Sequence, residues 1–567
     1  MRLRVQTCLL LLTLLGGLAH TQTVPGQTSP PPPATLTAQT LTTQRTSDQP
    51  TNPSIPAPGK IIQADVAQGP LGGRERGDVR QFLGVPYAAP PLGELRWQAP
   101  TPMPAWPGRR DASHFGNVCP QRPNAITGNP DRTLSGSEDC LYLNVYAPLA
   151  ASTGAAAAPM MVWVHGGSFD TGTGNIYDGS KLARDFGVVV VTLNYRLGPL
   201  GFLATPALGP QGSGNYGLMD VQAALRWVRA NAAAFGGDPG NVTAFGESAG
   251  GMILCDLLTS PASKGLFDKV ILQSGPCAAS INSVPLAQAL DIGARYTHDL
   301  NCPAAAEGAA CLRSKTVAEL IDMTVPGSRA PNTVALPPVW GDAVLPLEPA
   351  AAYRSGQFLK VPVMIGGNRD EGTIFTAYLA GQNRAMSLPL YWGLITVLNP
   401  AKNLTLLRQY PATTPAITGL TAATLVTDGL FACPVYSVTR QLAQSVPTYA
   451  YEFSDPQAVT ELTPTRSVPS LGAYHASELI YLFGAPLEGL ADPATFSATQ
   501  RQLSAQMGAY WTNFARTSNP NGPGLALWTP FEVAQPTVLT LRPDGSRPGT
   551  DFAARHQCNF WDKLDGR

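Results

Sequence analysis

Short, almost uninterrupted apolar runs alternate with amphipathic stretches from about Ile61 onward. Runs such as Met160 to Val164 and Val188 to Leu193 lack polar alternation, so they predict strands covered on both faces. Three further runs of this kind are Val242 to Phe245, Lys269 to Gln273 and Val361 to Ile365. Leu218 to Ala234 carries apolar residues at helical spacing. This alternation predicts an α/β fold with a central, mostly parallel mixed sheet flanked by helices.

The stretch Phe245 to Gly251 reads FGESAGG and contains the pattern G-x-S-x-G centred on Ser248. It directly follows a predicted strand and directly precedes the apolar helical pattern Met252 to Leu258. Small flanking residues let the backbone turn sharply and hold the serine at a helix N-terminus, where the helix dipole favours negative charge. We interpret this stretch as a nucleophile elbow rather than as a chance glycine-rich turn.

A serine nucleophile also needs hydrogen-bond donors for the oxyanion that forms on the substrate. Gly166 and Gly167 follow His165 directly after a predicted strand, and their backbone N–H groups can approach a substrate carbonyl closely. Together with the N–H of Ala249 they would form a hole with three donors. We interpret the His165 imidazole as structural and assign function to the glycine backbone alone.

The general base must be one of six histidines. In folds of this type the catalytic order is Ser, then Asp or Glu, then His, which leaves His475 and His556. His475 lies in a loop after the predicted strand Thr448 to Phe453, a position typical of a catalytic base, whereas we interpret His556 as a surface residue.

Two neighbouring carboxylates are candidates for the acid that orients the base. Asp370 and Glu371 follow the predicted strand Val361 to Ile365. Either could orient the histidine, and both could instead cap a helix that starts near Thr373. Composition does not choose between them.

The composition excludes some classes of protein. Of the 567 residues, 44% are hydrophobic, and the 38 basic residues balance the 38 acidic ones to a net charge of +0. A wholly disordered chain and a broad nucleic-acid-binding surface are therefore excluded. The chain has no CxxC pair and no clustered histidines, so we expect no metal site.

The N-terminal region predicts export. Residues 1–19 combine Arg2 and Arg4 with an apolar run from Cys8 to Leu15 and small residues up to Ala19, which is typical of a signal peptide. The run is shorter than the roughly 20 residues needed to span a bilayer, and we expect no stable membrane insertion. Residues 20–59 are rich in Thr, Pro, Gln and Ser and predict a disordered linker. We expect secretion, either extracellular or periplasmic, which permits disulfides.

Several long strings resemble the type-B carboxylesterase and cholinesterase family of α/β-hydrolases. Examples are FLGVPYAAPPLGELRWQAP at Phe82 to Pro100, SEDCLYLNVYAP at Ser137 to Pro148, and the continuous match from Gly214 to Gly251. The resemblance runs from about Ile61 to Lys563. It implies one α/β-hydrolase domain over residues 60–567 rather than the roughly four domains that length alone allows. It also implies a small-molecule ester substrate and no cofactor.

The resemblance carries roles to particular residues. It implies Ser248 as the nucleophile, His475 as the base and Glu371, not Asp370, as the acid. Glu247 is similar to the family's buried acid that supports the histidine. The residues that match the oxyanion donors are Gly166, Gly167 and Ala249.

Eight cysteines follow Cys8. The resemblance implies three bridges, which are Cys119–Cys140, Cys302–Cys311 and Cys433–Cys558. Cys255 and Cys277 are left over, and we expect them to pair behind the active site.

The Cys119 to Cys140 loop departs from the cholinesterases, whose corresponding loop carries a Trp that stacks on the choline cation. Here the loop contains no aromatic residue, so quaternary ammonium esters are poor candidates. The same loop is the lid in lipases that resemble this family. Here it is short and has few apolar residues, which favours dissolved esters over emulsified fat as substrates. The sequence therefore predicts a secreted serine carboxylesterase, with a long-chain lipase and a non-catalytic binding or adhesion protein as alternatives. The physiological ester and the oligomeric state stay open.

Overall fold

A computed structural model describes residues 59–566, apart from 123–132, 150–155, 210–213, 278, 280–281, 304–306, 323–335, 382–384, 400 and 413. The expected signal peptide (1–19) and all but the last residue of the expected linker (20–59) lie outside the described residues. One described helical stretch, Ile417–Leu442, is long and apolar enough to cross a membrane, but 67% of its apolar window is buried inside the protein.

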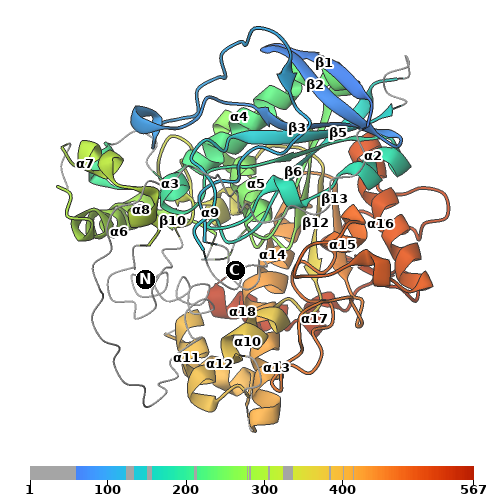
Figure 1. The fold of residues 1–567 in the computed structure, drawn as a ribbon. Coiled ribbons are helices and arrows are strands. Elements are labelled where there is room, and N and C mark those ends of the chain that lie inside the picture. Colours follow the sequence, from blue (N-terminus) through green and yellow to red (C-terminus); the bar gives the residue numbers. More distant parts are fainter. Residues whose placement is uncertain are drawn as a thin grey trace, which may run out of the picture.

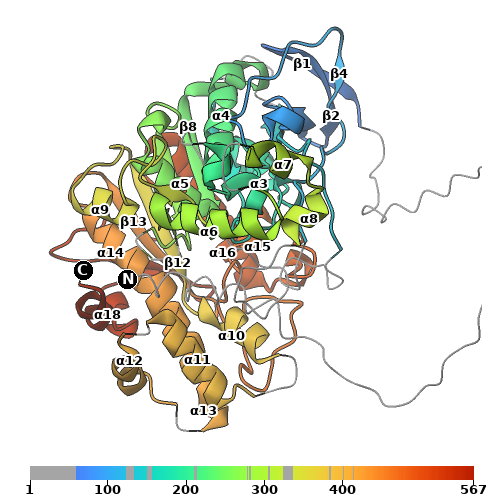
Figure 2. The same ribbon diagram turned by 90° about the vertical axis from the view of Figure 1, so that its left-hand side faces the viewer.

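A 13-stranded mixed sheet runs through the molecule (Figures 1 and 2). Its order is β1-β2-β3-β5-β7-β6-β8-β9-β12-β13-β14-β15, with β4 pairing β2. Pairing is parallel from β7 through β14 and antiparallel from β1 to β7 and at β15, apart from the parallel β2–β4 pair. The strands are β1 Ile61–Val66, β2 Gly69–Arg76, β3 Val79–Pro86, β4 Arg110–Asp111, β5 Tyr142–Pro148, β6 Ala158–Val164, β7 Val189–Leu193, β8 Gly237–Glu247, β9 Lys269–Gln273, β12 Val363–Asn368, β13 Thr448–Phe453, β14 Val538–Leu541 and β15 Arg547–Gly549. The mostly parallel α/β architecture predicted from the apolar runs is confirmed.

Helices cover both faces of this sheet, which explains the long apolar runs in its central strands. In β6, Val162 and Val164 face one core together with α4 (Tyr216–Asn231) and α5 (Ala249–Thr259). Met161 and Trp163 face the opposite core, with α15 (Leu479–Phe483) and α16 (Ala498–Thr517). Alternate side chains of one strand therefore enter two different cores.

A group of helices beyond the carboxyl ends of the strands builds a third core (Figure 1, bottom). It contains α10 (Gly372–Ala380), α11 (Leu388–Leu398), α12 (Asn403–Gln409) and α13 (Pro415–Val426). A π-helical turn, η8 (Thr427–Ala432), joins α13 to α14 (Cys433–Leu442). The C-terminal helices α17 (Phe552–Arg555) and α18 (Cys558–Asp565) pack against this group.

Most predicted strand bounds agree with the structure, and two strands are longer. β9 and β13 have the predicted bounds. β6 begins two residues earlier than predicted, and β7 begins one residue later. β8 begins at Gly237 because the polar stretch before Val242 also pairs with β6, and this stretch carries no apolar signal. β12 continues to Asn368, which places Asn368 and Glu371 at the carboxyl edge of the sheet.

Four disulfides pair all eight cysteines of the described chain. They are Cys119–Cys140, Cys255–Cys277, Cys302–Cys311 and Cys433–Cys558. These are the four pairings expected from the sequence. Cys255–Cys277 ties α5 to the loop that follows β9.

Candidate active site

Ser248 occupies a sharp turn between β8 and α5. Its φ of 54° and ψ of −123° are strained for a residue with a side chain, as expected for a nucleophile elbow. The glycines around it are required by space: a Cβ at Gly250 would lie 2.0 Å from the carbonyl oxygen of Val164, and one at Gly246 2.8 Å from the backbone of Gly250. The first turn of α5 therefore packs directly against the end of β6.

A short polar contact joins Glu371 to His475. Oε2 of Glu371 lies 2.6 Å from Nδ1 of His475, although the two residues are 104 positions apart. The other carboxylate oxygen accepts hydrogen bonds from the Ser274 hydroxyl at 2.6 Å and from the Asn368 N–H at 2.7 Å. These bonds fix the Glu371 carboxylate as an acceptor that faces the imidazole.

Asp370, the neighbouring carboxylate, has a different environment. Its Oδ2 accepts the N–H of Ala473 at 2.9 Å, and its own N–H donates to the Ala473 carbonyl. Asp370 therefore holds the loop that carries His475 and does not contact the ring. The side chain of Glu371, at the N-cap of α10, makes no capping hydrogen bond, and Thr373 N–H is satisfied by the backbone oxygen of Asp370.

The second ring nitrogen of His475 faces Glu247. Nε2 lies 3.1 Å from Oε1 of Glu247, and in the described part of the chain no hydrogen bond joins His475 to Ser248. Burial lowers the pKa of His475, but the Glu247 and Glu371 carboxylates outweigh it and raise the pKa to about 9. Burial, together with the nearby carboxylates of Glu478 and Glu371, raises the pKa of Glu247 to about 8, against the pull of His475. Glu247 thus raises the pKa of His475 while His475 lowers that of Glu247, so the charge of each group affects the other.

Glu478 is a further buried acid of the site, to which sequence reasoning gave no role. Its two oxygens accept the side-chain amides of Gln273 at 3.0 Å and Asn368 at 2.6 Å. Burial raises the pKa of Glu478 to about 7. The sequence could have indicated Glu478, because it lies three residues after His475 in the stretch that resembles the family. Asn368 thus links Glu478 to Glu371 through its side chain and its backbone.

Two aromatic rings cover the imidazole of His475, and sequence reasoning missed both. The ring of Phe375 in α10 lies 5.1 Å from the imidazole, and that of Phe431 in η8 lies 4.9 Å away, centroid to centroid. The two phenyl rings stack on each other at 5.7 Å. No local pattern marks them, because only the packing of α10 against the helices after it brings them to His475.

The glycines after β6 approach the Ser248 turn through Gly166. A Cβ at Gly166 would lie 2.9 Å from Cβ of Ser248, which shows how closely this glycine approaches the turn. Gly167 has a φ of 107°, a conformation that favours glycine. Within the described chain, the N–H groups of Gly166, Gly167 and Ala249 donate no hydrogen bond to a protein group.

His165 is buried beside these glycines, and its imidazole stacks on Tyr195 at 4.4 Å. Its Nδ1 lies 2.8 Å from the carbonyl oxygen of Gly166. Burial lowers the pKa of His165 to about 4, so the ring is neutral at physiological pH. This environment agrees with a structural imidazole.

The interpretation of His556 as a surface residue is wrong. His556 is only 5% exposed and lies between the carboxylates of Asp428 and Glu452, each 2.8 Å from a ring nitrogen. Its position near the C-terminus suggested exposure, but α17 and α18 fold back onto η8 and β13. His556 is therefore a buried ion-pair partner, separate from His475.

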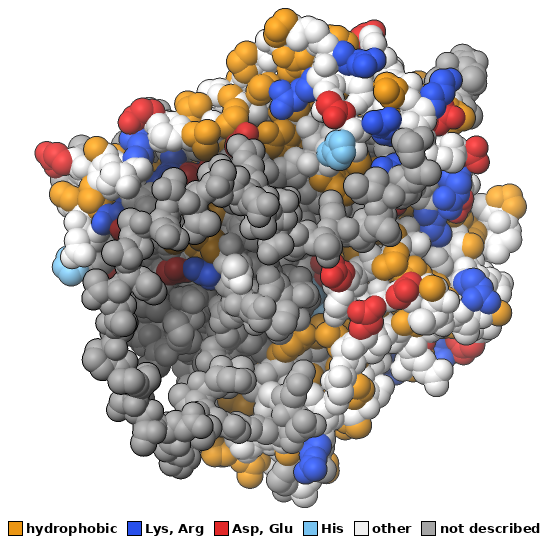
Figure 3. Space-filling model, in the orientation of Figure 1, with side chains coloured by type: hydrophobic (Ala, Val, Ile, Leu, Met, Phe, Trp, Pro, Cys, Tyr) orange, Lys and Arg blue, Asp and Glu red, His pale blue; other side chains and the backbone are white. Residues whose placement is uncertain are grey.

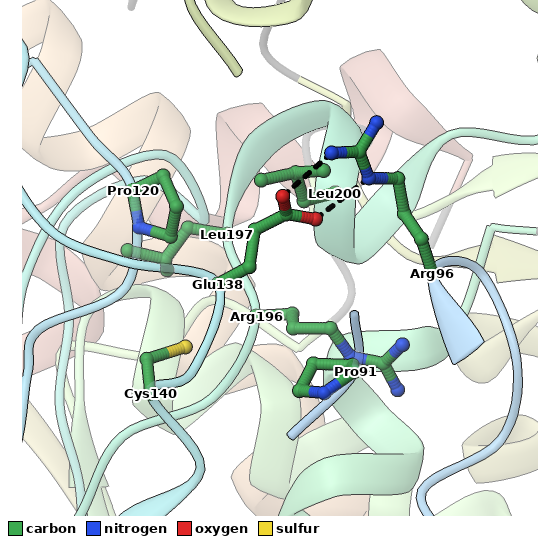
Figure 4. Close-up of a pocket in the computed structure, with 8 residues that line it drawn as sticks. All are labelled: Pro91, Arg96, Pro120, Glu138, Cys140, Arg196, Leu197 and Leu200. Atoms are coloured by element: carbon green, nitrogen blue, oxygen red, sulfur yellow. Dashed lines mark hydrogen bonds and ion pairs between the residues drawn. The ribbon is translucent and has the colours of Figure 1, made fainter. Parts of the chain in front are cut away.

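A small pocket lies at the base of the Cys119–Cys140 loop, away from these residues (Figure 4). Its charged side chains are already paired. Arg96 binds both oxygens of Glu138 at 2.5 and 2.6 Å, and Arg196 binds Asp220 at 2.7 Å. We assign no ligand to it. The described residues also include no group of three or more His, Cys, Asp or Glu side chains arranged to hold a metal ion.

Comparisons with known proteins agree with this geometry. The model of the carboxylesterase family matches residues 60–561. Para-nitrobenzyl esterase of Bacillus subtilis (strain 168) is 35% identical, over 80% of this chain and 89% of its own, and fumonisin B1 esterase of Sphingopyxis macrogoltabida is 36% identical, over 85% and 87%. Mouse neuroligin-3 is 36% identical over 82% of this chain, but the chain spans only 61% of its length.

Solved structures give the same result. A structure of PNB esterase superposes with a TM-score of 0.74 and 32% identity, over 88% of this chain and 99% of that one. A structure of a thermophilic PNB esterase has a TM-score of 0.73 at the same identity and coverage. Together with the sheet order and the residues matched, these similarities show that the chain belongs to the carboxylesterase family and has its α/β-hydrolase fold.

Proposed function

We propose that the chain is a serine hydrolase of carboxylic esters that works through an acyl-enzyme intermediate. Ser248 is the nucleophile, His475 the general base and Glu371 the residue that orients the base. The observation that carries this proposal is the 2.6 Å contact between Glu371 and His475 beside the strained Ser248 turn. The relatives named as esterases support ester hydrolysis as the reaction.

In the proposed first half-reaction, His475 Nε2 takes the proton of Ser248 while Oγ attacks the ester carbonyl. Glu371, held by Ser274 and the Asn368 N–H, keeps the proton on Nδ1 and stabilises the imidazolium that forms. The imidazolium then protonates the leaving alcohol. Water repeats the sequence on the acyl-enzyme and releases the acid.

The contact between Nε2 and Glu247 affects how His475 accepts the proton of Ser248. For Nε2 to accept a proton, it must turn from Glu247 toward the adjacent Ser248 oxygen. Hydrogen bonds of this kind are often incomplete in a free enzyme and tighten when substrate binds. The Glu247 carboxylate raises the pKa of His475, so it also stabilises the imidazolium that forms once the proton has moved.

The oxyanion that forms during attack needs donors that are not already engaged. The N–H groups of Gly166, Gly167 and Ala249 have no protein acceptor in the described chain, Gly166 lies against Ser248, and Ala249 follows Ser248 directly. Ala249 is also the first residue of α5, whose dipole favours negative charge there. These three groups are the proposed oxyanion hole.

We propose that the enzyme is secreted. Four disulfides join the described cysteines, and such bridges form and persist in oxidising compartments. The proposed signal peptide (1–19) and linker (20–59) fit this location, with residues 60–567 as the hydrolase domain.

The proposed substrates are small dissolved esters. A long-chain lipase would use the same catalytic residues and would differ in pocket and lid. A non-catalytic binding protein is a second candidate because neuroligins are among the relatives. The presence of Ser248, Glu371 and His475 together favours the enzyme.

Initial hydrolysis rates on p-nitrophenyl esters from acetate to palmitate test the proposal, with Ser248→Ala as the matched variant. We expect the highest kcat/KM on short chains and a loss of several orders of magnitude in Ser248→Ala. A maximum on long chains with a jump at the solubility limit would instead assign a lipase. Absence of Ser248-dependent turnover on every ester would refute the enzyme and favour the binding protein.

A further inference from the structure

His556 is a buried cation outside the proposed catalytic residues. It follows α17, and its Nδ1 and Nε2 each lie 2.8 Å from a carboxylate oxygen, of Asp428 and Glu452 respectively. Burial raises the pKa of Asp428, but its hydrogen bonds to His556 and Tyr410 oppose this, and an ionised carboxylate only accepts hydrogen bonds. With both carboxylates ionised, both ring nitrogens donate and the ring is an imidazolium. Although burial lowers the pKa of His556, the hydrogen bonds to Asp428 and Glu452 raise it to about 9.

The same carboxylates are held by further groups, which together we call the C-terminal latch: Tyr410, Asp428, Glu452, Arg555 and His556. Arg555 binds both oxygens of Glu452 at 2.9 and 3.0 Å, and the Tyr410 hydroxyl donates to Asp428 at 2.8 Å. The latch joins α17 to β13 and to η8. Its ionic hydrogen bonds are buried, where they are stronger than at the surface.

Asp428 belongs to η8, a π-helical turn. Such turns are rare and energetically poor in isolation, and they recur at functional sites. This one is held from outside by His556 and by Trp561 of α18, whose ring would meet a Cβ at Gly429 at 2.4 Å. The C-terminal helices therefore define the shape of η8.

Two contacts run from η8 to the proposed catalytic residues. Phe431 places its ring 4.9 Å from the imidazole of His475. The Thr427 hydroxyl accepts the N–H of Gly372 at 2.8 Å, directly after Glu371 in the chain. One turn thus touches both the base and the segment that carries the acid.

We propose that His556 is a positioning residue for ester hydrolysis. It fixes η8 through Asp428, so that Phe431 holds the His475 imidazole in the orientation that Glu371 requires. The inference rests on the proposed function. It predicts that loss of the latch lowers kcat rather than substrate binding, because the latch acts on the base.

The test compares His556→Gln, Phe431→Leu and the double variant on p-nitrophenyl acetate, with rates expressed per active site counted by fluorophosphonate labelling carried to completion. The completed labelling counts assembled Ser248 sites, so misfolded protein does not enter the rate. We expect each single variant to lower kcat by about tenfold with KM changed by less than about twofold, since small misplacement of a catalytic group is costly. The double variant should lose little more than either single one, because both act on one contact.

Arg440→Gln is the matched control. Arg440 pairs with Asp562 at 2.6 Å and so also ties α14 to α18, but it is not part of the latch. We expect its kcat to stay within about twofold of the wild type.

Three results would overturn the proposal: a normal kcat per site in His556→Gln, a normal kcat in Phe431→Leu, or losses that multiply in the double variant. Phe431→Leu leaves the ion pairs of the latch intact. Its kcat therefore tests the contact between η8 and His475 even where His556→Gln fails to fold. A wild type without Ser248-dependent turnover would refute the proposed function itself. An active wild type with unaffected variants would refute this inference alone.

Discussion

At the scale of single residues, the imidazole of His475 is the point where three carboxylates meet. Glu371 binds Nδ1, Glu247 lies 3.1 Å from Nε2, and Glu478, which binds Asn368, raises the pKa of both Glu247 and His475 through its charge. So many buried acids cannot all be ionised at little cost, which is why the pKa values of Glu247 and Glu478 rise. The pH dependence of the reaction should therefore report this cluster and not an isolated histidine.

Glu247→Gln should move the acidic limb of kcat/KM to lower pH. The Glu247 carboxylate is the strongest of the groups that raise the pKa of His475, so its removal lowers that pKa. His475 is then neutral at lower pH, and the rise in kcat/KM begins at a lower pH than in the wild type. Rates between pH 5 and 10 measure the midpoint, and Asp268→Asn, which removes a carboxylate paired with Arg229, should leave it unchanged. An unmoved or higher midpoint in Glu247→Gln would contradict the account.

Gly166→Ala should reduce kcat by about a hundredfold, the cost typical of a lost oxyanion donor. The added Cβ would lie 2.8 Å from Oε2 of Glu247 and 2.9 Å from Cβ of Ser248, so the backbone or the serine must shift. Gly393→Ala is the control, because a Cβ there meets nothing within 4 Å. Steady-state rates on p-nitrophenyl acetate compare the two, and equal activity would argue against a close approach of Gly166.

At the scale of elements, the carboxyl ends of the strands assemble the site. β8 delivers Ser248, β6 delivers Gly166 and Gly167, and the segment after β12 delivers Glu371. Parallel pairing of β6, β8, β9 and β12 brings these ends to one edge. The latch adds a second element-level feature, since α17 and α18 determine how η8 meets that edge.

The latch also predicts a pH-dependent stability. The pKa of His556 in the folded protein is about 9, above the ordinary histidine value of about 6.5. Its stabilisation is therefore complete below pH 6.5 and is lost as pH rises through 9. The difference in free energy of unfolding between wild type and His556→Gln, measured with urea, should be largest near pH 6.5 and shrink above pH 9. A difference that is constant or grows with pH would show that His556 is not a cation in the fold.

Particular elements show what the sequence could and could not predict. Continuous apolar runs located β6, β7 and β9, since burial on both faces leaves a strong local signal. The GxSxG turn located Ser248 because glycine is sterically required around it. The polar start of β8, the burial of His556 and the rings of Phe375 and Phe431 were missed, since each depends on partners distant in the chain. The choice between Asp370 and Glu371 needed the resemblance, and in the structure Glu371 contacts the His475 ring whereas Asp370 binds the backbone of Ala473.

At the scale of the whole molecule, the site rests on the large sheet and the three cores packed around it. The disulfides close loops of very different size. Cys433–Cys558 spans 125 residues and fixes the C-terminal helices next to the latch. Cys302–Cys311 spans only 9 residues. A disulfide stabilises the fold by lowering the conformational entropy of the unfolded chain, and this effect grows with the length of the loop that it closes.

Removal of Cys433–Cys558 by paired Cys→Ala substitutions should therefore lower stability more than removal of Cys302–Cys311. The chain-entropy relation gives about 5 kcal/mol for the long loop and about 2.6 kcal/mol for the short one. Thermal and urea unfolding of both variants under non-reducing conditions measure the two losses. A larger loss of stability on removal of Cys302–Cys311 would contradict the stabilising role assigned to Cys433–Cys558.

Covalent labelling with a fluorophosphonate, followed by peptide mapping, tests the central claim most directly, because such reagents trap a serine that its base has activated. We expect one phosphonyl group per chain on Ser248, and labelling slowed by orders of magnitude in His475→Ala. An unlabelled wild type, labelling at another residue, or an unchanged rate in His475→Ala would contradict the proposed Ser248–His475–Glu371 mechanism.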